Sequence, residues 1–498
     1  MVNRIFVVNM ILPIILGTIV AFLSVSWIYF KILNIALQKN LVDNPNARKL
    51  QKRPVPMLGG IAVFFGLLAG VMSGDVVHNL TGSEVYHPLL PICCAMMVML
   101  YVGAMDDIMG LSPKSRFVIE ILTVLGLVFS TNLCIDSLHG LWGLNDFDWW
   151  IGVPLTVLAG VGIINSINMI DGVNGLSSGL CIACCILFGI SFILLGDIAN
   201  AVLSFSMAGA LMPFFLHNVF GEKSRMFIGD AGTMMMGILM TWFLICLLSK
   251  EGADKYAAVI KNVNMIALSI AILSVPIADT LRVMTMRMAK KKSPFQPDKT
   301  HLHHVFVNLG VSHFVTAMSE ILIGLVIVAI WAFAYYKGAS YEAQLYVVIV
   351  SAMFFVWGTY GILRYNITHQ TEVLHQLTHY GISTQLSRKI WWKSFSAYID
   401  GPFVNYHPKP IFDLQAAAEL DNYIATLDKE TPKEKDRNLI LEFMKGKVEV
   451  YVDDILENSG AERLRVYPIL FEEQQKGHIS VVKSCGIGAP YIVALGSL

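Results

Sequence analysis

Charged residues are scarce in this chain, since Asp, Glu, Lys and Arg make up 14% of its 498 residues while 55% are hydrophobic. In a soluble protein about a quarter of the residues carry charge. Acidic and basic residues number 36 each, so no net charge favours a nucleic-acid partner. The scarcity is uneven, because residues 1–364 hold 41 charges and residues 365–498 hold 31. The sequence therefore predicts a membrane part followed by a soluble part.

The eight cysteines show no metal or disulfide pattern. They do not provide the two ligand pairs of a zinc site or the regular spacing of a disulfide framework. Most lie inside apolar stretches. We interpret them as packing residues.

Long apolar segments, by contrast, recur throughout the first part of the chain. A helix needs ~20 apolar residues to cross a hydrocarbon core ~30 Å thick. The sequence predicts an all-α polytopic membrane protein with about 11 transmembrane helices. The predicted spans are Ile5–Tyr29, Leu58–Ser73, Leu89–Ala104, Phe117–Asn132, Trp150–Ile167, Leu176–Gly196, Asn200–Phe215, Gly232–Ser249, Val263–Met286, Phe314–Tyr335 and Gln344–Leu363.

The distribution of Lys and Arg between these spans predicts the orientation. One alternate set of connections carries 16 of them, whereas the opposite set carries five. Positively charged connections stay in the cytoplasm. With eleven crossings, the N-terminus is then outside, and the tail from Arg364 is in the cytosol.

The first polar motif is Asp106-Asp107, at the inner end of the third span. Neighbouring residues of a helix point about 100° apart, so both carboxylates can serve one site only near a helix end. Paired carboxylates suit Mg²⁺, which prefers oxygen ligands and keeps waters that a phosphate can replace. The alternative is a solvated helix end.

The second motif lies between the fifth and sixth spans. Asn165, Asn168 and Asp171 follow one another at intervals of three residues, and would share one face of a helix. Gly172 and Gly175 then permit a tight turn close to a ligand. Because a structural turn does not need so many carboxamide and carboxylate groups, we interpret this motif as part of a site.

The third motif is the cytoplasmic loop Arg225–Gly232, which enters the eighth span and contains Asp230. Asp at this position can bind a metal or cap the N-terminus of the following helix. Small residues beside Asp230 leave room for a diphosphate. Both readings are open from the sequence.

The fourth motif extends from the ninth span into the longest basic loop. Lys290–Lys292 are consistent with an anchor to anionic lipid. His301, His303 and His304 lack the Cys or acidic partners of a zinc site, and beside Arg282 they suit a ligand with several phosphates.

In this order, the four motifs resemble a known family over residues 5–365, the polyprenyl-phosphate N-acetylhexosamine-1-phosphate transferases of glycosyltransferase family 4. They read MDD, NxxNMIDGxNG, FIGDAG and SPFxPDKxHLHH, and the last is typical of the WecA-like branch. The resemblance implies transfer of N-acetylhexosamine 1-phosphate, with GlcNAc expected, from a UDP-sugar to an undecaprenyl-type polyprenyl phosphate. UMP would leave, and the lipid diphosphate sugar would initiate cell-surface glycan synthesis. The resemblance also implies that the enzyme uses Mg²⁺, for which Mn²⁺ could substitute, and that it lies in the cytoplasmic (inner) membrane. It is compatible with a homodimer.

The resemblance also implies roles for individual residues. Asp106, Asp107 and Asp171 would be catalytic, and Asn168 and Asp230 would hold the metal. The substrate-binding residues would be Arg48, Lys49, Arg116, Asn165, Asn174, Arg282, His301, His303 and His304.

This chain departs from the family pattern in two places. Gln51 and Met57 stand where the family often has His and a base, and Met109 replaces a third Asp after Asp106-Asp107. Two mechanisms are open. We favour direct attack of the lipid phosphate, which is largely dianionic at neutral pH because its second pKa is ~6. The rival is an aspartyl-phosphate intermediate.

The sequence disfavours three other classes of protein. A transporter should show inverted repeats or interrupted spans with buried charge, and the sequence shows no convincing repeat. A CDP-alcohol phosphotransferase should have Ala-Arg after Asp171-Gly172, where this chain has Val-Asn. A structural scaffold has no use for the three histidines opposite three acidic motifs.

Residues 366–498 lie beyond the resemblance. We expect residues 366–400 to form an amphipathic linker on the membrane surface, anchored by Trp391, Trp392 and Lys393. Residues 401–498 predict a small cytosolic α/β domain of unknown role, for which regulation, partner docking and a second activity are open. Its expected elements are helices at Ile411–Leu427 and Pro432–Phe443, and strands at Val448–Val452, Leu464–Leu470, His478–Val482 and Tyr491–Leu495.

Overall fold

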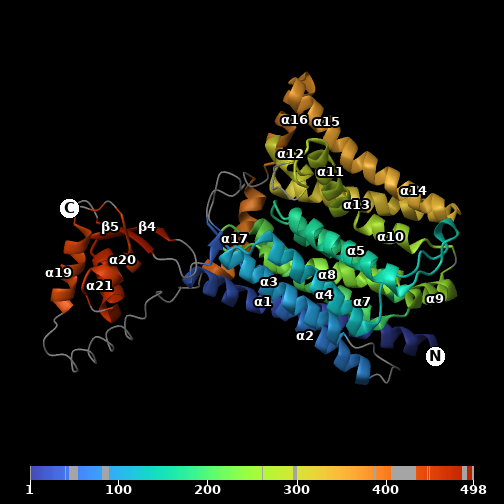
Figure 1. The fold of residues 1–498 in the computed structure, drawn as a ribbon, viewed down its shortest axis with the longest axis horizontal. Coiled ribbons are helices and arrows are strands. Elements are labelled where there is room, and N and C mark those ends of the chain that lie inside the picture. The colour runs from blue at the N-terminus through green and yellow to red at the C-terminus, as the bar shows by residue number, and fades with distance from the viewer. Residues whose placement is uncertain are drawn as a thin grey trace. The chain divides into compact units, whose positions relative to one another are not determined.

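The computed structural model describes residues 2–39, 41–43, 54–80, 89–260, 262–294, 300–385, 389–404, 433–445, 447, 449–461, 463–484 and 491–495. The chain divides into two units, and Figure 1 labels their elements. The first comprises Met1–Leu33 and Asn44–Phe403, and the second comprises Asn34–Asp43 and Val404–Leu498.

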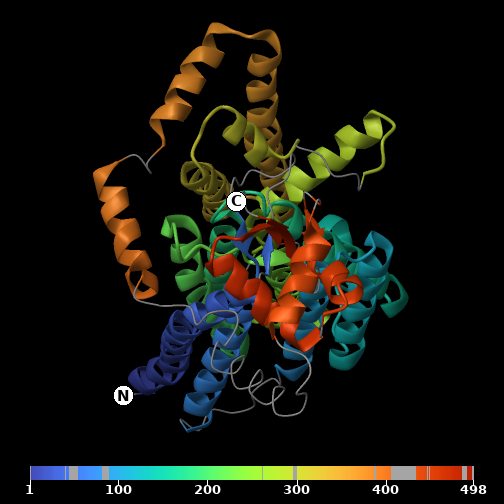
Figure 2. The ribbon, with the colours of Figure 1, turned by 90° about the vertical axis from the view of Figure 1, so that its left-hand side faces the viewer.

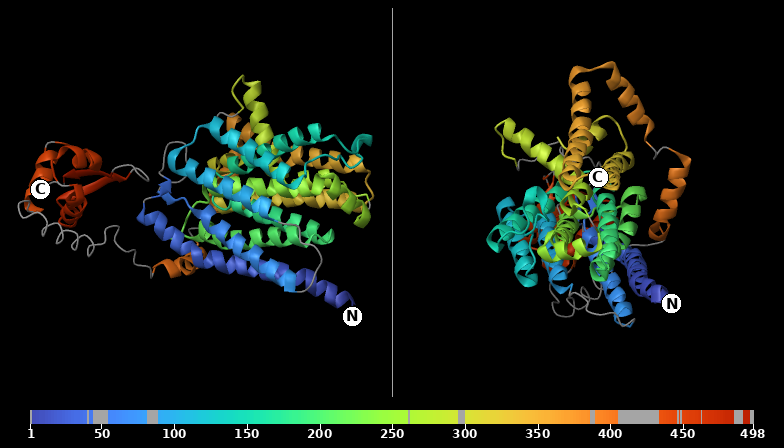
Figure 3. Two further views of the ribbon diagram at one scale, coloured as in Figure 1. Left: turned by 60° about the horizontal axis from the view of Figure 1, so that its bottom comes forward. Right: turned by 90° about the vertical axis from the view of Figure 1, so that its right-hand side faces the viewer.

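The first unit is built of long helices that run alongside one another, as Figures 1 and 3 show, and Figure 2 views most of them nearly end-on. In chain order the helices through residue 404 are α1 (Val2–Gln38), α2 (Gly59–Leu80), α3 (Leu90–Met109), α4 (Pro113–Thr131), α5 (Trp149–Met169), α6 (Leu176–Leu194), α7 (Ile198–Phe220), α8 (Gly229–Leu248), α9 (Lys250–Val259), α10 (Met265–Ile272), α11 (Ser274–Ala289), α12 (Leu302–Asn308), α13 (His313–Tyr336), α14 (Tyr341–Ala352), α15 (Thr359–His369), α16 (Glu372–Ser383) and α17 (Ile390–Val404). Short elements are β1 (Val42–Asp43), β2 (Val55–Pro56), η1 (Leu141–Gly143) and η2 (Met353–Gly358).

Each of the eleven predicted spans coincides with helix in the described residues. Nine helices there are long and apolar enough to cross a membrane, with α14, η2 and α15 counted as one. A tenth crossing would be α10 with α11, which are bent by 76° at Leu273. The remaining predicted span is α4, which is 19 residues long and carries Lys114, Arg116 and Glu120. The prediction of an all-α polytopic membrane protein is confirmed.

Among the nine helices of the described residues, α8 is the most deeply buried, since 94% of the residues in its apolar stretch are buried. Two glycines let neighbouring helices approach its first turn closely. A Cβ atom on Gly103 of α3 would lie 2.4 Å from the Ala231 nitrogen, and one on Gly60 of α2 would lie 2.4 Å from the Gly232 nitrogen. Because such distances exclude any side chain, α2, α3 and α8 meet backbone to backbone at this point.

In the first unit, the start of α4 is fixed by its sequence. Ser112 precedes the helix and accepts a hydrogen bond from the Ser115 amide at 3.1 Å. Pro113 occupies the first helical position, where no amide hydrogen is needed. Arg116 is therefore presented in the first turn of α4.

Beyond residue 432, the described part of the second unit contains three helices and a three-stranded sheet. The helices are α19 (Lys433–Met444), α20 (Val452–Asn458) and α21 (Arg463–Gln475), and the strands are β3 (Val450–Tyr451), β4 (Ile479–Ser484) and β5 (Tyr491–Leu495). The strand order is β3-β5-β4 with antiparallel pairing, which places Val493 opposite both Val450 and Val481. The predicted helix Ile411–Leu427 lies outside the described residues.

One predicted strand of the tail is wrong, because Leu464–Leu470 belongs to α21. Val466, Ile469, Leu470 and Glu473 are buried, and their spacing is that of one helix face. A short apolar run cannot be assigned to strand or helix from its composition alone. The other predicted strands overlap β3, β4 and β5.

Candidate active site

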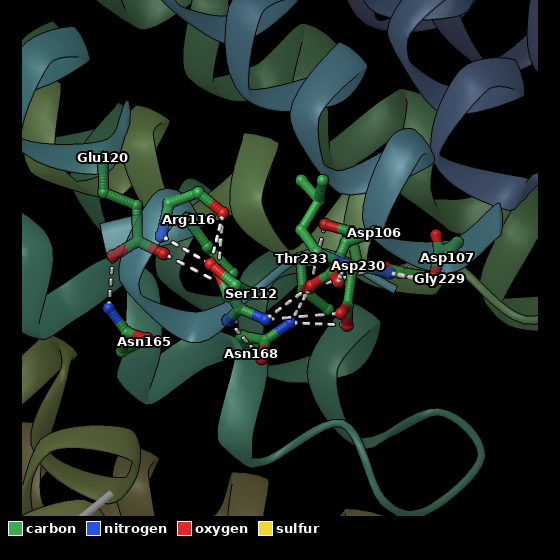
Figure 4. Close-up of polar contacts among 12 residues, drawn as sticks. Asp106, Asp107, Ser112, Arg116, Glu120, Asn165, Asn168, Gly229, Asp230 and Thr233 are labelled. Atoms are coloured by element: carbon green, nitrogen blue, oxygen red, sulfur yellow. Dashed lines mark hydrogen bonds and ion pairs between the residues drawn. The ribbon is translucent and has the colours of Figure 1, made fainter. Parts of the chain in front are cut away.

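Arg116 joins three of the sequence motifs (Figure 4). Its Nη1 donates to Asp106 Oδ2 at 3.0 Å and contacts Asp230 Oδ2 at 3.4 Å. Its Nη2 donates to Asn168 Oδ1 at 2.8 Å. These residues lie near the ends of α4, α3, α8 and α5, so four separate helices converge on one guanidinium.

Asn168 and Asp230 are also bonded directly to each other. The Asn168 Nδ2 group donates to Asp230 Oδ1 at 2.7 Å and to the Thr233 hydroxyl at 2.8 Å. This pair of bonds fixes the amide orientation, so that its oxygen faces Arg116. The Asp230 carboxylate therefore faces Arg116 and Asn168, and it does not cap the N-terminus of α8.

The cap of α8 is instead provided by Asp107 from α3. Its Oδ1 accepts a hydrogen bond from the Asp230 amide at 3.0 Å, and its Oδ2 accepts one from the Ala231 amide at 3.2 Å. Gly229 has φ +72°, and a Cβ atom there would lie 2.3 Å from Asp107 Oδ2. Of the two neighbouring carboxylates, Asp106 thus faces Arg116 and Asp107 holds the start of α8.

A second layer of contacts holds Arg116 from behind. Its Nε donates to Glu120 Oε1 at 3.2 Å, and Glu120 Oε2 accepts from Asn165 Nδ2 at 2.5 Å. The Glu120 side chain is 1% exposed. Asn165, predicted to bind substrate, therefore contacts a buried carboxylate. Glu120 was not predicted, although its spacing of four residues from Arg116 within an apolar helix was a usable signal.

Asp171 lies in the turn between α5 and α6, exposed at the surface. Its Oδ1 accepts a hydrogen bond from the Ser177 hydroxyl at 2.5 Å. The nearby Asn174 uses its backbone amide to donate to His313 Nδ1 at 3.4 Å. The structure thus leaves Asp171 outside the Arg116 cluster.

Arg282 and His301 are joined through Asp279, which is fully buried. His301 Nδ1 lies 2.7 Å from Asp279 Oδ2, and Arg282 Nη2 donates to Asp279 Oδ1 at 2.6 Å. The Arg282 guanidinium also lies 3.6 Å from the centre of the Tyr360 ring. Arg282 Nη2 also donates to the Thr300 carbonyl at 2.7 Å, so the Asp279–Arg282 pair holds the start of the His301 loop.

His303 packs against the second motif. A Cβ atom on Gly172 would lie 2.4 Å from His303 Nε2, so the imidazole covers the glycine backbone. His303 is 1% exposed, and burial, with His304 and His301 nearby, holds the pKa of its imidazole well below the ordinary value. His303 is therefore neutral at physiological pH, while the ring of the partly exposed His304 lies 4.4 Å from it, tilted by 46°.

The first cytoplasmic loop is described only at its end. Arg48, Lys49 and Gln51 lie outside the described residues. The Phe227 amide donates to the Pro56 carbonyl at 2.8 Å, and the Gly59 amide donates to the Phe227 carbonyl at 3.0 Å. The end of this loop therefore supports the segment that leads into Asp230.

The oxygen atoms around Arg116 suit a hard cation. In the described part of the chain, no three His, Cys, Asp or Glu side chains are grouped as metal ligands. However, carboxylate oxygens of Asp106 and Asp230 and the amide oxygen of Asn168 converge on one positive group. Oxygen donors of this kind are those that Mg²⁺ prefers. The residues present therefore fit that ion.

Comparison with known proteins places the same residues within a family. The model of glycosyl transferase family 4 matches residues 89–248, which include Asp106, Arg116, Asn168 and Asp230. A Yersinia pestis undecaprenyl-phosphate alpha-N-acetylglucosaminyl 1-phosphate transferase is 31% identical over 286 residues, covering 55% of this chain and 72% of the relative. A probable undecaprenyl-phosphate N-acetylglucosaminyl 1-phosphate transferase of Bacillus subtilis is 30% identical over 314 residues, covering 63% and 82%.

The family model spans the first three of the four motifs, which lie between Asp106 and Gly232. The chain therefore belongs to glycosyl transferase family 4, among the WecA-like polyprenyl-phosphate N-acetylhexosamine-1-phosphate transferases.

Proposed function

We propose that this protein transfers N-acetylglucosamine 1-phosphate from its UDP-sugar to undecaprenyl phosphate, releasing UMP and forming the lipid diphosphate sugar that starts a cell-surface glycan. The observation that carries the proposal is the convergence of Asp106, Asn168 and Asp230 on Arg116. A nucleotide diphosphate requires positive charge and oxygen ligands for a cation in one place, and these four side chains supply both.

Magnesium is part of the proposal. Asp106, Asn168 and Asp230 would hold the ion, and its charge would stabilise the diphosphate as UMP leaves. Arg116 would then bind phosphate oxygens with the same two Nη groups that now contact Asp106 and Asn168.

We favour direct attack by the lipid phosphate. An oxygen of that phosphate forms a bond to the β-phosphorus of the donor, the bond from the β-phosphorus to the bridging oxygen breaks, and UMP departs with the electron pair. The contacts of the three aspartates support this choice. Asp107 accepts two backbone amides at the start of α8, and Asp106 would hold the metal, so each carboxylate already has a role other than nucleophile. Asp171 is exposed and remains the candidate for the covalent route.

Cellular placement is a further part of the proposal. The excess of Lys and Arg in one set of connections supports a cytoplasmic active site in the inner membrane, with the N-terminus outside and the C-terminal tail in the cytosol. UDP-N-acetylglucosamine would reach the site from the cytosol, and undecaprenyl phosphate would reach it from the bilayer.

The test is a transfer assay with purified protein, Mg²⁺, undecaprenyl phosphate and a panel of UDP-sugars, in which UMP and the lipid product are both measured. Asp230→Asn should remove most transfer at ordinary Mg²⁺ and recover part of it at high Mg²⁺, because one charged ligand is lost. Asp254→Asn, an exposed aspartate of α9, is the matched control. A transporter, which could share the break between α10 and α11, would consume neither substrate and would contradict the proposal.

A further inference from the structure

The helix α17 lies outside residues 89–248, yet all of it up to Phe403 belongs to the first unit. Trp392, Ser396, Ile399 and Asp400 are each at most 9% exposed, and their spacing places them on one face of the helix. Tyr398, on another face, is 77% exposed. A carboxylate on the buried face of a helix requires partners that compensate for its loss of water.

Asp400 finds these partners in the connection between α7 and α8. Its Oδ2 accepts hydrogen bonds from the amides of Glu222 and Lys223, each at 3.0 Å. Its Oδ1 accepts from the Ser224 amide at 3.0 Å and from the Ser224 hydroxyl at 2.7 Å. Burial opposes the charge of Asp400, but the Ser224 hydroxyl and the three amides outweigh it and hold the pKa of this carboxyl below its usual value.

Aromatic rings fix the middle of α17 beside the same connection. The Trp392 ring lies 4.7 Å from the Phe220 ring, at the end of α7, and 5.7 Å from the Phe314 ring, at the start of α13. Phe395 meets Phe220 edge to face at 4.9 Å. The helix thus contacts the connection through both charge and packing, and these contacts set its position along α7.

The bonded connection leads directly into the active site. The Ser224 carbonyl accepts a hydrogen bond from the Tyr29 hydroxyl at 2.7 Å, and the Met226 carbonyl accepts one from Asn218 Nδ2 at 2.9 Å. Further along, the Ile228 carbonyl accepts from the Gly60 amide at 2.9 Å. Hydrogen bonds therefore hold residues 222–228 at successive positions before α8 begins at Gly229.

We propose that Asp400 is a positioning residue for transfer, and that α17 is a strut that holds residues 222–228 so that Asp230 faces Arg116. The strut accounts for a charged residue on the buried face of a helix. It also gives a role to a segment beyond the family motifs. The part of the proposal that concerns rate rests on the proposed transferase function and its metal ligand Asp230.

The test uses the full chain with Asp400→Asn, which keeps the size of the side chain and places an amide against amide donors. Hydrogen–deuterium exchange of the peptide that contains residues 222–228 should become faster in the variant. The Mg²⁺ concentration for half-maximal transfer should rise about tenfold, the equivalent of one charge-assisted hydrogen bond. Loss of folded protein alone would lower the rate at every Mg²⁺ concentration without moving this midpoint. Asp254→Asn, matched in chemistry but exposed, should change neither quantity.

A double-mutant cycle with Ser224→Ala makes the assignment specific. Ser224→Ala removes one of the four hydrogen bonds to Asp400, so its effect in the Asp400→Asn background should be smaller than in the wild type. If Asp400→Asn does not fold, Ser224→Ala alone should still speed exchange and raise the Mg²⁺ midpoint. Unchanged exchange and an unchanged midpoint in folded variants would overturn the strut. If the wild type transfers no sugar phosphate, the proposed function fails, and the exchange measurement still decides whether α17 holds the connection.

Discussion

Replacement of Arg116 by Gln removes the positive charge around which the active site is arranged. The guanidinium pairs with Glu120 at 3.2 Å, and the two side chains are 17% and 1% exposed. Removal of one partner from a buried pair costs about 3–5 kcal/mol, because the other charge is left without compensation. The Asp230 contact adds little, since that side chain is 36% exposed and its pair is 3.4 Å long. We expect Arg116→Gln to lower the free energy of unfolding by about 3 kcal/mol, through Glu120 and through Asp106, which is 13% exposed and pairs with Arg116 at 3.0 Å.

The same substitution should lower kcat/KM for transfer by about 10²–10³, the usual cost of removing one preorganised group that stabilises developing charge. Stability and activity can then be separated. The double variant Arg116→Gln, Glu120→Gln leaves no unpaired charge at position 120, so the part of the lost stability that comes from Glu120 should return while transfer stays low. Thermal unfolding in detergent measures the first quantity, and UMP release measures the second.

Lys114→Gln, which removes an exposed charge from the same helix, is the control and should leave both quantities near the wild type. The reasoning about Glu120 would be refuted if the double variant were as unstable as Arg116→Gln. The reasoning about the active site would be refuted if Arg116→Gln transferred sugar phosphate within threefold of the wild-type rate.

Three further predictions concern the backbone, the topology and pH. Gly229→Ala should lower the free energy of unfolding by about 1 kcal/mol because of the positive φ, and by more because the new methyl group clashes with the Asp107 carboxylate. Gly338 has φ +75° and open space around it, so thermal unfolding of Gly338→Ala should show only the first of these two losses. A cysteine placed at the exposed Lys290 should react with a membrane-impermeant reagent only after cells are opened, and one at the exposed Leu144 should react in intact cells; the reverse labelling would contradict the orientation. Burial holds the pKa of His303 below its unfolded value of about 6.5, so the contribution of His303 to stability is present above that pH and is lost as the pH falls below it. The wild type should therefore lose more stability from pH 7 to pH 5 than His303→Gln. Equal losses would count against a buried neutral imidazole.

The sequence predicted the helices, and it singled out three polar residues that lie together in the structure, because both features leave strong local signals. Apolar length gives the spans, and Asp106, Asn168 and Asp230 stand at the polar ends of those spans, where the structure brings them together. The division of labour between Asp106 and Asp107 could not be predicted, since it depends on the backbone amides of α8, which are far away in the chain. The role of Asp400 could not be predicted for a related reason. Its partners are mainly main-chain amides, which every residue except proline has, so the sequence does not distinguish them.

The contact between α3 and α8 has a consequence for how the enzyme can move. Gly103 touches the first turn of α8 without space for a methyl group, and Asp107 from the next turn of α3 caps the same residues. A rotation or slide of either helix would break the cap and force backbone atoms together, so the two helices behave as a rigid body. Asp106 and Asp230 then keep a constant separation through the catalytic cycle. Arg116 reaches Asp106 and Asp230 from α4 through a long side chain, which can change its rotamer. We therefore expect substrate entry and product release to be accompanied by rotamer changes of Arg116 rather than by movement of the two aspartates.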